Sequence, residues 1–293
     1  MKSVFVGLGR MGSRMAGRIL DAGLPLELYN RDPAKTKPFL ERAKVHLDLN
    51  SALAGADVVF TMLSDDDALR SVISEETLKL AAPEAVHVSM SSVSLEVTRE
   101  LSFLAKKLGR THLSSPVFGR PAAAEAGTLF LCVAGEKEAK AKALKHLEAM
   151  GKVRDFGENP LAANAVKIAG NLMISSLIES FSEAFALTGK NGADPGAFYE
   201  LMTEGLFNAP VAKLYGKLIL DKDYDAPGFT AALGAKDVGL AKAAGEDSKV
   251  SLPLASLLAE RFRKVLAKGW GNKDWTVVAE LAKEDDSSDD PTP

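Results

Sequence analysis

Cysteine and histidine are scarce in this sequence. The 293 residues include a single cysteine, Cys132, so no disulfide can form within the chain. The four histidines lie far apart and show no spacing of metal ligands; they are His46, His87, His112 and His146. We therefore expect no metal site and a reducing location such as the cytoplasm.

Excess positive charge and long apolar runs are also missing. The chain has 36 lysines and arginines against 39 aspartates and glutamates, a formal net charge of -3, whereas nucleic-acid-binding domains usually present a basic face. No uninterrupted apolar run reaches the roughly 20 residues that a membrane helix needs. The apolar part of the opening MKSVFV is too short for a signal peptide. We expect no nucleic-acid partner, no membrane partner and no signal peptide.

The first half of the chain alternates between short β-rich runs and helical stretches. The β-rich runs lie at 2–6, 24–30, 56–63 and 85–91. Helical stretches follow them: one that ends at Gly23, and others at 33–42, 66–74 and 94–108. This alternation predicts a parallel sheet covered by helices. We expect the runs at 112–118 and 128–135 to extend the same sheet, 136–151 to form a helix and 152–157 to add a short strand.

The second half has a helical pattern with few β-like runs. Helices are predicted at 160–189, 195–204, 209–221, 230–245, 252–268 and 273–283. The closing stretch KEDDSSDDPTP is acidic and has no apolar residue, which is typical of a disordered tail. The change of pattern near residue 158 indicates a domain boundary.

The turn after the first predicted strand is rich in glycine. Its residues are Gly7, Leu8, Gly9, Arg10, Met11 and Gly12, a G-x-G-x-x-G pattern between a strand and a helix. Gly7 permits the tight turn, Gly9 lets the backbone approach a pyrophosphate, and Gly12 lets the helix pack close to the strand. The free amides at the helix N-terminus favour phosphate binding. The pattern predicts a dinucleotide cofactor.

These observations together predict an α/β fold with two domains. Residues 1–158 are expected to form an N-terminal Rossmann domain that binds the dinucleotide. Residues 159–283 are expected to form an all-α C-terminal domain that begins with a long interdomain helix, and residues 284–293 a disordered acidic tail.

The end of the second predicted strand indicates which cofactor binds. Sites that prefer NAD usually carry an acidic residue there to bind the ribose 2′-hydroxyl, whereas this chain has Asn30 followed by Arg31. An arginine can hold a 2′-phosphate, and Lys35 adds a second positive charge. Asp32 has two interpretations: it binds a ribose hydroxyl, or it caps the helix at 33–42. We expect NADP(H) to be favoured over NAD(H).

The long helix at 161–190 carries polar residues on one stripe. Asn164, Lys167 and Asn171 share a face at 3.6 residues per turn. Polar side chains on a mostly apolar helix need water or partners. A lysine in this position, beside a dinucleotide domain, is a candidate proton donor.

The sequence resembles the β-hydroxyacid dehydrogenase family, which includes 3-hydroxyisobutyrate dehydrogenase and glyoxylate/succinic semialdehyde reductases. The resemblance covers about residues 3–283 and rests on GLGRMGSRMAGRIL, TMLSDD, SMSSVSLEVTREL, SSPVFGRPAAAEAGTL, NAVKIAGN and GAKDVGLA. It implies that Lys167 is the catalytic lysine and Asn171 its neighbour. For the cofactor it implies contacts from Met62, Leu63, Ser64, Ser91, Ser92 and Lys236. For the substrate it implies contacts from Ser92, Phe118, Gly119, Arg120, Lys167 and Asn171.

Several residues depart from the family pattern. Phe118 stands where the family usually has serine, Arg120 replaces its second glycine, and Ser89 replaces an aspartate. Leu161 and Ala163 replace glycines before the lysine. Arg120 either grips a substrate carboxylate or points to solvent or a nearby acid. These departures leave the substrate open.

The resemblance implies an NADP(H)-dependent β-hydroxyacid dehydrogenase or a reductase of small aldehydes or keto acids, with Lys167 as general acid and base. The expected substrate is a carboxylate-bearing aldehyde or hydroxy acid. Two alternatives remain: an imine reductase-like enzyme, against which Lys167 argues, and a non-catalytic dinucleotide-binding protein. The family's C-terminal helices pack against one another in dimers or tetramers, so a homo-oligomer is expected.

Overall fold

The computed structural model describes residues 1–284 and divides into two compact units. The first unit comprises residues 1–167, and the second begins at Ile168. The division falls within one long helix, while the domain boundary at 158 stays a prediction. Of the acidic tail predicted at 284–293, residues 285–293 lie outside the described residues.

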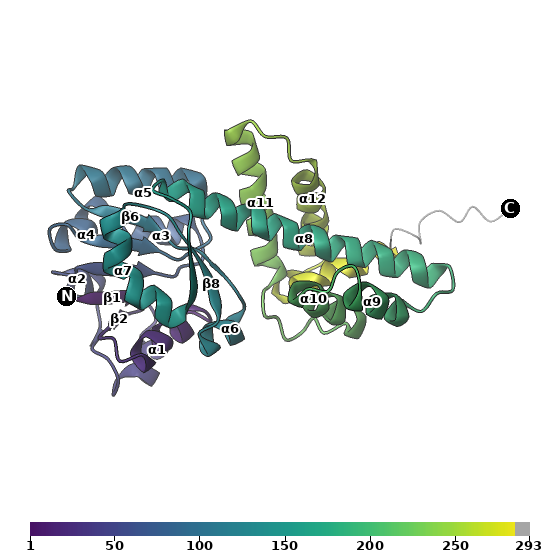
Figure 1. The fold of residues 1–293 in the computed structure, drawn as a ribbon, viewed down its shortest axis with the longest axis horizontal. Helices are drawn as coiled ribbons and strands as arrows, with labels where there is room; N and C mark the ends of the chain where they lie inside the picture. The colour runs from purple at the N-terminus through teal and green to yellow at the C-terminus, as the bar shows by residue number, and fades with distance from the viewer. Residues whose placement is uncertain (285–293) are drawn as a thin grey trace. The chain divides into compact units, whose positions relative to one another are not determined.

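The first unit is built on a six-stranded parallel sheet (Figure 1). Its strands are β1 (Ser3–Val6), β2 (Glu27–Tyr29), β3 (Val45–His46), β4 (Val58–Thr61), β5 (Val86–Ser89) and β6 (Thr111–Ser114). The order β3-β2-β1-β4-β5-β6 runs outward in both directions from β1 and β4. This is the Rossmann order, and ligands bind where it reverses, beyond the carboxyl ends of β1 and β4. The predicted fold class is confirmed.

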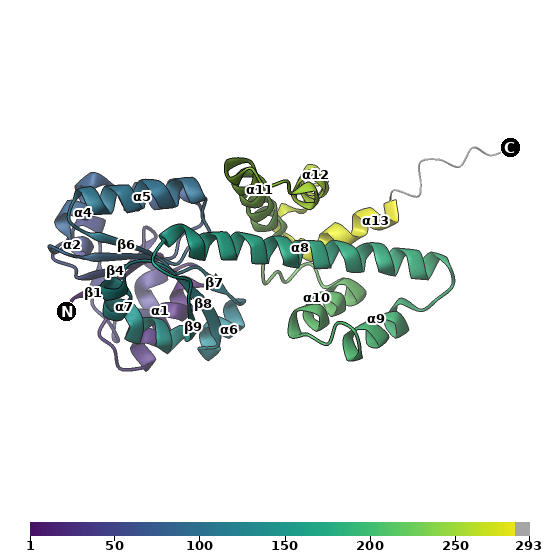
Figure 2. The ribbon, with the colours of Figure 1, turned by 45° about the horizontal axis from the view of Figure 1, so that its top comes forward.

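Helices cover both faces of this sheet, which explains its continuously apolar strands. Phe5 packs in one core cluster with α1 (Gly12–Asp21) and α7 (Lys137–Met150). Val4 and Val6 pack in another, with residues of α2 (Leu49–Leu53), α3 (Asp66–Val72), α4 (Glu75–Leu80) and α5 (Leu95–Lys107). In Figure 2, α5 lies on one side of the sheet and α1 and α7 on the other.

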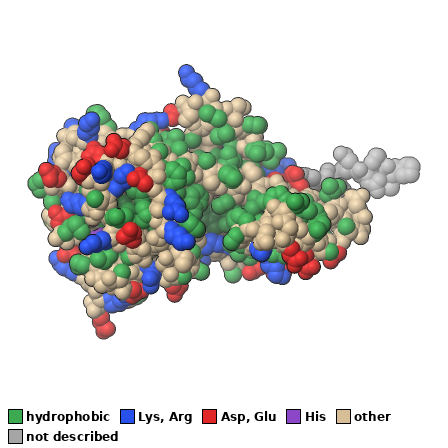
Figure 3. Space-filling view, in the orientation of Figure 1, with side chains coloured by type: hydrophobic (Ala, Val, Ile, Leu, Met, Phe, Trp, Pro, Cys, Tyr) green, Lys and Arg blue, Asp and Glu red, His purple; other side chains and the backbone are tan. Residues whose placement is uncertain are grey.

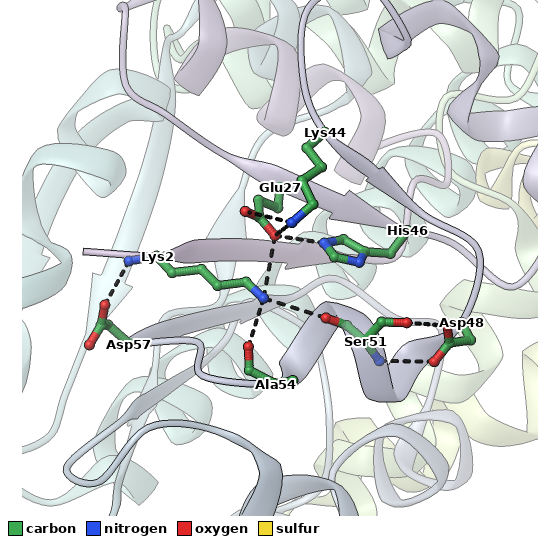
Figure 4. A network of polar contacts seen from close by, with 8 residues as sticks. All are labelled: Lys2, Glu27, Lys44, His46, Asp48, Ser51, Ala54 and Asp57. Carbon is green, nitrogen blue, oxygen red and sulfur yellow. Dashed lines mark hydrogen bonds and ion pairs between the residues drawn. The ribbon is translucent and has the colours of Figure 1, made fainter.

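A polar network holds the amino end of the sheet, opposite the carboxyl edge (Figure 4). Glu27 on β2 pairs with His46 Nε2 on β3 at 2.6 Å and with Lys2 Nζ, just before β1, at 3.3 Å. Lys44 Nζ lies 3.4 Å from the same carboxylate. Lys2 also donates to the carbonyl of Ala54 at 2.8 Å. The network therefore joins the three strands on this side of the sheet.

The prediction that 112–118 and 128–135 extend one sheet is wrong beyond Ser114. The strands β7 (Val117–Phe118), β8 (Leu129–Val133) and β9 (Gly151–Asp155) form a separate sheet in the order β7-β8-β9. Pro116 cannot donate to a ladder, and its carbonyl accepts from Cys132 at 2.9 Å instead. The short helix α6 (Pro121–Ala126) connects β7 to β8.

Other predicted elements change type or length. The helix predicted at 33–42 is a 3₁₀ helix, η1 (Pro33–Phe39), which contains Pro38; a proline inside an α-helix would clash with the preceding turn. The helix predicted at 273–283 is mostly the 3₁₀ segment η3 (Trp275–Glu280), followed by α13 (Leu281–Glu284). A further 3₁₀ turn, η2, spans Trp270–Asn272.

The described part of the second unit is helical, as predicted. It contains most of α8 (Pro160–Lys190) and all of α9 (Pro195–Glu204), α10 (Pro210–Asp221), α11 (Ala231–Ser248) and α12 (Pro253–Ala267). Proline begins α9, α10 and α12, where its missing N–H costs nothing. Ile178 and Phe181 of α8 pack in a core with Phe262 and Trp275.

Helix α8 would pass for a membrane span by length and hydropathy alone. The central helix of a soluble protein passes the same test. Ala163 of α8 packs beside Cys132 in the first unit, and Phe185 packs in the core of the second. Apolar residues of α8 therefore pack inside each of the two units.

Candidate cofactor and catalytic site

The glycine turn follows β1 at the carboxyl edge of the sheet, and its backbone leaves no room for a side chain at Gly7 or Gly12. Gly7 has φ +99° and donates to the carbonyl of Tyr29 at 3.0 Å. A Cβ on Gly12 would lie 1.9 Å from the Gly7 oxygen, so only glycine lets α1 start here. A Cβ on Gly9 would meet nothing within 4 Å. Open space beside Gly9 fits a pyrophosphate that approaches the backbone.

The N-terminus of α1 is open to an anion. Its first cap residue, Met11, makes no side-chain cap hydrogen bond, so the first amides keep their donors and the positive end of the dipole. Arg10 is exposed at the start of the turn, and its carbonyl accepts from Arg14 Nη1 at 2.7 Å. The residues present therefore fit a bound dinucleotide phosphate.

The side chain of Asn30 shapes the turn from the end of β2. Its Oδ1 accepts from the amide of Leu8 at 2.7 Å, and its Nδ2 donates to the carbonyl of Asp32 at 2.9 Å. Leu8 itself is buried. Among the predicted cofactor residues, Asn30 thus has an internal role in holding the turn.

The charged residues after β2 divide into a cap and two exposed cations. Asp32 accepts a hydrogen bond from the amide of Ala34 at 3.0 Å and so caps η1. Of the two roles predicted for Asp32, the structure shows the helix cap. Arg31 and Lys35 are exposed. In this structure, which describes residues 1–284, no hydrogen bond or ion pair engages either of these two side chains. Both remain available to a phosphate.

The loops after β4 and β5 are joined by hydrogen bonds beside the glycine turn. Ser91, fully buried, accepts from the amide of Leu63 at 2.8 Å, and Asp66 accepts from the amide of Ser94 at 2.9 Å. A Cβ added to Gly7 would lie only 2.4 Å from the carbonyl oxygen of Met62. These loops are thus fixed before any ligand binds.

Two other predicted contacts at this edge are more accessible. Ser64 is exposed and donates to the carboxylate of Asp65 at 2.6 Å. Ser92 is half-buried, one residue beyond the buried Ser91. Of the two serines, Ser92 therefore has the surface to meet a ligand, whereas the Ser91 hydroxyl supports the loop.

Lys167 lies in the first unit, near the start of α8, and its side chain is buried. Its exposed fraction is 9%. Its Nζ lies 4.2 Å from the centroid of the Phe118 ring, a cation–π contact. Burial raises the pKa of the nearby Cys132 thiol, against the opposing effect of the Lys167 charge. The thiol therefore stays protonated at neutral pH.

The rest of the predicted substrate segment surrounds β7. Phe118 packs against the small buried cluster of Cys132, Ala134 and Ala163. Gly119 has φ +140°, and a Cβ there would lie 2.5 Å from Leu129 Cδ2. Arg120 is half-buried and precedes the first residue of α6. The segment thus presents an aromatic ring to Lys167.

Asn164 does not share the surroundings of Lys167. Its Nδ2 donates to Thr98 Oγ1 at 2.7 Å and to Ser114 Oγ at 3.1 Å. These bonds fasten the first turns of α8 to α5 and β6. Asn164 therefore anchors α8 to the first unit.

In the second unit, Asn171 and Lys236 share one acidic partner. Asn171 Nδ2 donates to Asp237 Oδ2 at 2.5 Å, and Lys236 Nζ lies 3.2 Å from Asp237 Oδ1. Asp237 is 3% exposed, so its charge needs both partners. Sequence reasoning assigned no role to Asp237, although it directly follows Lys236. Asn171 also follows Lys167 on α8 by one helical turn.

The described residues place charges of both signs on the surface. On the face seen in Figure 3, Lys and Arg side chains are interspersed with Asp and Glu over the first unit. Within residues 1–284, no group of three or more His, Cys, Asp and Glu side chains could hold a metal.

Comparisons with known proteins agree with this architecture. Residues 2–167 match the model of the NAD binding domain of 6-phosphogluconate dehydrogenase, and residues 162–282 match the NAD-binding model of NADP-dependent 3-hydroxyisobutyrate dehydrogenase. The chain is 36% identical to the uncharacterized oxidoreductase YfjR of Bacillus subtilis, over 97% of this chain and 100% of that protein.

Two further relatives have named substrates. The chain is 31% identical to the NAD-dependent L-serine dehydrogenase of Pseudomonas aeruginosa, over 96% of this chain and 98% of that one. The structure of Mycobacterium tuberculosis 3-hydroxyisobutyrate dehydrogenase with L-serine is similar, with a TM-score of 0.86 and 27% identity over 96% of this chain and 99% of that one.

The glycine turn, the order of the strands and the matches over nearly the whole chain lead to one conclusion. The chain is an oxidoreductase that uses a nicotinamide dinucleotide and belongs to the β-hydroxyacid dehydrogenase family.

Proposed function

We propose that this protein is an NADP(H)-dependent β-hydroxyacid dehydrogenase, or a reductase of the corresponding small aldehyde or keto acid, with Lys167 as general acid and base. The observation that carries the proposal is the buried ammonium of Lys167, in the dinucleotide-binding unit, against the ring of Phe118. A bound nicotinamide supplies or accepts the hydride.

The protein must manage the charge and the proton on the substrate oxygen. In the reduction direction, the protonated Lys167 Nζ stabilises the negative charge that develops on oxygen and then donates a proton to it. In the oxidation direction, the neutral amine accepts the hydroxyl proton. Asn171, one turn along α8, is a hydrogen-bond partner for the lysine or the substrate hydroxyl.

The proposed preference for NADP(H) rests on Arg31 and Lys35. Both are exposed cations after β2, and Asp32, the acidic residue there, caps η1. The names of the relatives divide on this point: the second family model is described as NADP-dependent, while the P. aeruginosa relative is NAD-dependent. The charges at residues 31 and 35 favour the 2′-phosphate.

The proposed substrate is a 3-hydroxy acid or its aldehyde. L-Serine and 3-hydroxyisobutyrate, the substrates in the names of two relatives, both carry a hydroxyl on the carbon beta to a carboxylate. Arg120 is the proposed carboxylate partner, because a guanidinium binds carboxylates bidentately. A panel of 3-hydroxyisobutyrate, L-serine, glyoxylate, succinic semialdehyde and a cyclic imine, each with both cofactors, tests this class.

The deciding experiment is Lys167→Ala. We expect kcat to fall by about 10²–10⁴, the usual range for losing a positioned acid, with NADPH affinity nearly unchanged by fluorescence titration. Lys152→Ala, which removes an exposed lysine from β9 of the same unit, is the matched control and should keep wild-type turnover. Near-wild-type turnover of Lys167→Ala on the best substrate would refute the proposed role.

We also propose a homo-oligomer, located in the cytoplasm, that associates through the second unit. Large apolar side chains are exposed there: Leu187 is 67% exposed, Leu201 66% and Leu206 82%. The strong exposure of three leucines in one unit is the observation that supports an interface there. Light scattering coupled to size exclusion tests it, since a monomeric mass at micromolar concentration would contradict the proposal.

A further inference from the structure

A line of buried polar side chains crosses the first unit from β4 to α8. Thr61 Oγ1 on β4 lies 2.9 Å from His87 Nε2 on β5. His87 Nδ1 lies 3.0 Å from His112 Nδ1 on β6. The two imidazoles face each other because the register of β5 and β6 places His87 opposite His112. We call the full set the polar chain; its members are Thr61, His87, His112, Ser114, Asn164 and Thr98.

The second half of the polar chain reaches the helix that carries Lys167. His112 Nε2 lies 3.5 Å from Ser114 Oγ, the longest contact of the set. Asn164 Nδ2 on α8 donates to Ser114 Oγ at 3.1 Å and to Thr98 Oγ1 on α5 at 2.7 Å. Five elements of one unit are thus joined by side chains alone.

Every member of the polar chain is removed from water. Exposed fractions run from 0% for Thr61 and Ser114 to 4% for His112. Burial of polar groups in the middle of an apolar sheet is costly unless they are paired, and apolar residues could fill these strand positions at lower cost. Once paired, a buried network rigidifies its surroundings. The polar chain therefore links the elements that it joins rigidly.

The two imidazoles are neutral under ordinary conditions. Burial lowers the pKa of His112 to about 4, and burial together with His112 lowers the pKa of His87 well below its usual value. The gap between the two Nδ1 atoms therefore holds one proton. Each ring donates through one nitrogen and accepts through the other, so hydrogen bonds run in a single direction from Thr61 to Ser114 or the reverse.

The ends of the polar chain lie next to the two working parts of this unit. Thr61 is the last residue of β4, and the following Met62 carbonyl packs against Gly7 of the cofactor turn. Asn164 precedes Lys167 by three residues on α8, within one helical turn. The polar chain is therefore a continuous link from the cofactor edge to the helix turn that holds the lysine.

We propose that the polar chain positions Lys167 relative to the cofactor turn, and that His87 and His112 are positioning residues for the hydride-transfer reaction. This inference rests on the proposed role of Lys167. An ångström-scale misplacement of a catalytic group can cost about 10²-fold in rate, so a network that fixes the first turns of α8 would act on kcat while touching neither cofactor nor substrate.

The test is the double variant His87→Phe/His112→Phe, which keeps two packed rings and removes all four nitrogens. We expect kcat to fall about tenfold or more, with NADPH affinity and KM changed by less than about threefold. The matched control is His146→Phe, because His146 is also buried, on α7, with its ring 5.2 Å from that of Phe60. The control should keep wild-type kcat per cofactor-binding site.

A double-mutant cycle with Lys167→Ala separates positioning from plain stability. If the polar chain acts through Lys167, the histidine variants have no further effect on the residual rate of Lys167→Ala. A double variant that keeps wild-type kcat, or one that lowers the rate of Lys167→Ala as much as that of wild type, would overturn the inference. A fully active Lys167→Ala would instead refute the proposed function itself.

Single-hydroxyl variants keep the test decisive if the double variant fails to fold. Thr61→Val and Ser114→Ala each remove one hydroxyl, on either side of the histidine pair, with little change of volume. We expect each to lower kcat about threefold or more at unchanged NADPH affinity. Wild-type kcat in both would overturn the inference.

Discussion

The cofactor turn and the surroundings of Lys167 belong to the same unit but are built differently. The cofactor turn is shaped mainly by its backbone: Gly7 needs a positive φ, Gly12 lies against the Gly7 carbonyl, and Gly9 faces open space. The surroundings of Lys167 are formed by side chains from distant segments. Phe118 of β7 contacts the ammonium, and Asn164 is held by Thr98 and Ser114.

This difference separates the backbone turn that binds the cofactor from the side chains that adapt the reaction. The backbone turn tolerates little substitution, because Gly7 is required by its left-handed φ and Gly12 by its short contact with the Gly7 oxygen. A side-chain environment can change one residue at a time. Among the departures from the family pattern, Phe118 contacts the lysine and Leu161 and Ala163 precede it on α8, while the glycine turn is intact.

Two glycine variants test the backbone side of the comparison, with the largest expected effect. In Gly12→Ala the new Cβ lies 1.9 Å from the Gly7 oxygen, so we expect a lower Tm and NADPH affinity reduced by more than about 100-fold. In Gly9→Ala the Cβ meets no protein atom within 4 Å. Its Tm should be unchanged, while affinity falls about tenfold because the methyl lies where the phosphate approaches. Unchanged affinity in Gly9→Ala would place the pyrophosphate elsewhere.

The variant Arg31→Asp tests whether a side chain also contributes to cofactor binding at this edge of the sheet. Loss of a charge-assisted hydrogen bond to the 2′-phosphate is worth about 1.5–3 kcal/mol, so the ratio of NADPH to NADH affinity should fall about 10–100-fold. Lys37→Asp makes the same charge change at another exposed lysine of η1. An equal fall of this affinity ratio in both variants would mean that the cofactor responds only to the overall charge of this region and has no direct contact with Arg31.

Phe118→Leu sharpens the comparison at the lysine. Leucine keeps an apolar side chain but removes the ring face, so we expect kcat to fall about 3–10-fold, in line with a cation–π contact of about 1 kcal/mol. Phe118→Tyr keeps the ring and should restore kcat. Equal kcat in all three proteins would show that the contact is only packing.

The smallest effect is expected at the amino end of the sheet, away from both sites. Burial raises the pKa of Glu27, but the hydrogen bond from His46 and the charge of Lys2 outweigh it, so the pKa lies below its ordinary value of 4.5. This carboxylate therefore adds stability above pH 4.5, and the contribution is lost as the pH falls through the lowered pKa.

Urea unfolding of Glu27→Gln measures that contribution. The free energy of unfolding of wild type should exceed that of the variant by about 0.5–1 kcal/mol at pH 7. This difference should shrink towards pH 3. Turnover at pH 7 should be equal in the two proteins, because Glu27 contacts neither the glycine turn nor Lys167. A difference in stability that stays constant down to pH 3 would contradict the ion-pair account.

Local patterns in the sequence determined much of this protein. The alternation of strands and helices predicted the parallel sheet, the spacing of glycines predicted the cofactor turn, and the 3.6-residue period predicted that Lys167 and Asn171 lie one turn apart. Each depends on contacts between residues close in the chain, so periodicity and glycine spacing carry the information.

The tertiary structure alone decided which distant side chains meet. Only the pairing of β5 with β6 brings His87 to His112, and only the packing of α8 brings Asn164 to Ser114. The separate sheet that contains Phe118, and the partnership of Asn171 with Asp237, likewise depend on segments far apart in sequence. Strand register and helix packing set these contacts through the whole core, because no local pattern encodes which residues will lie opposite one another.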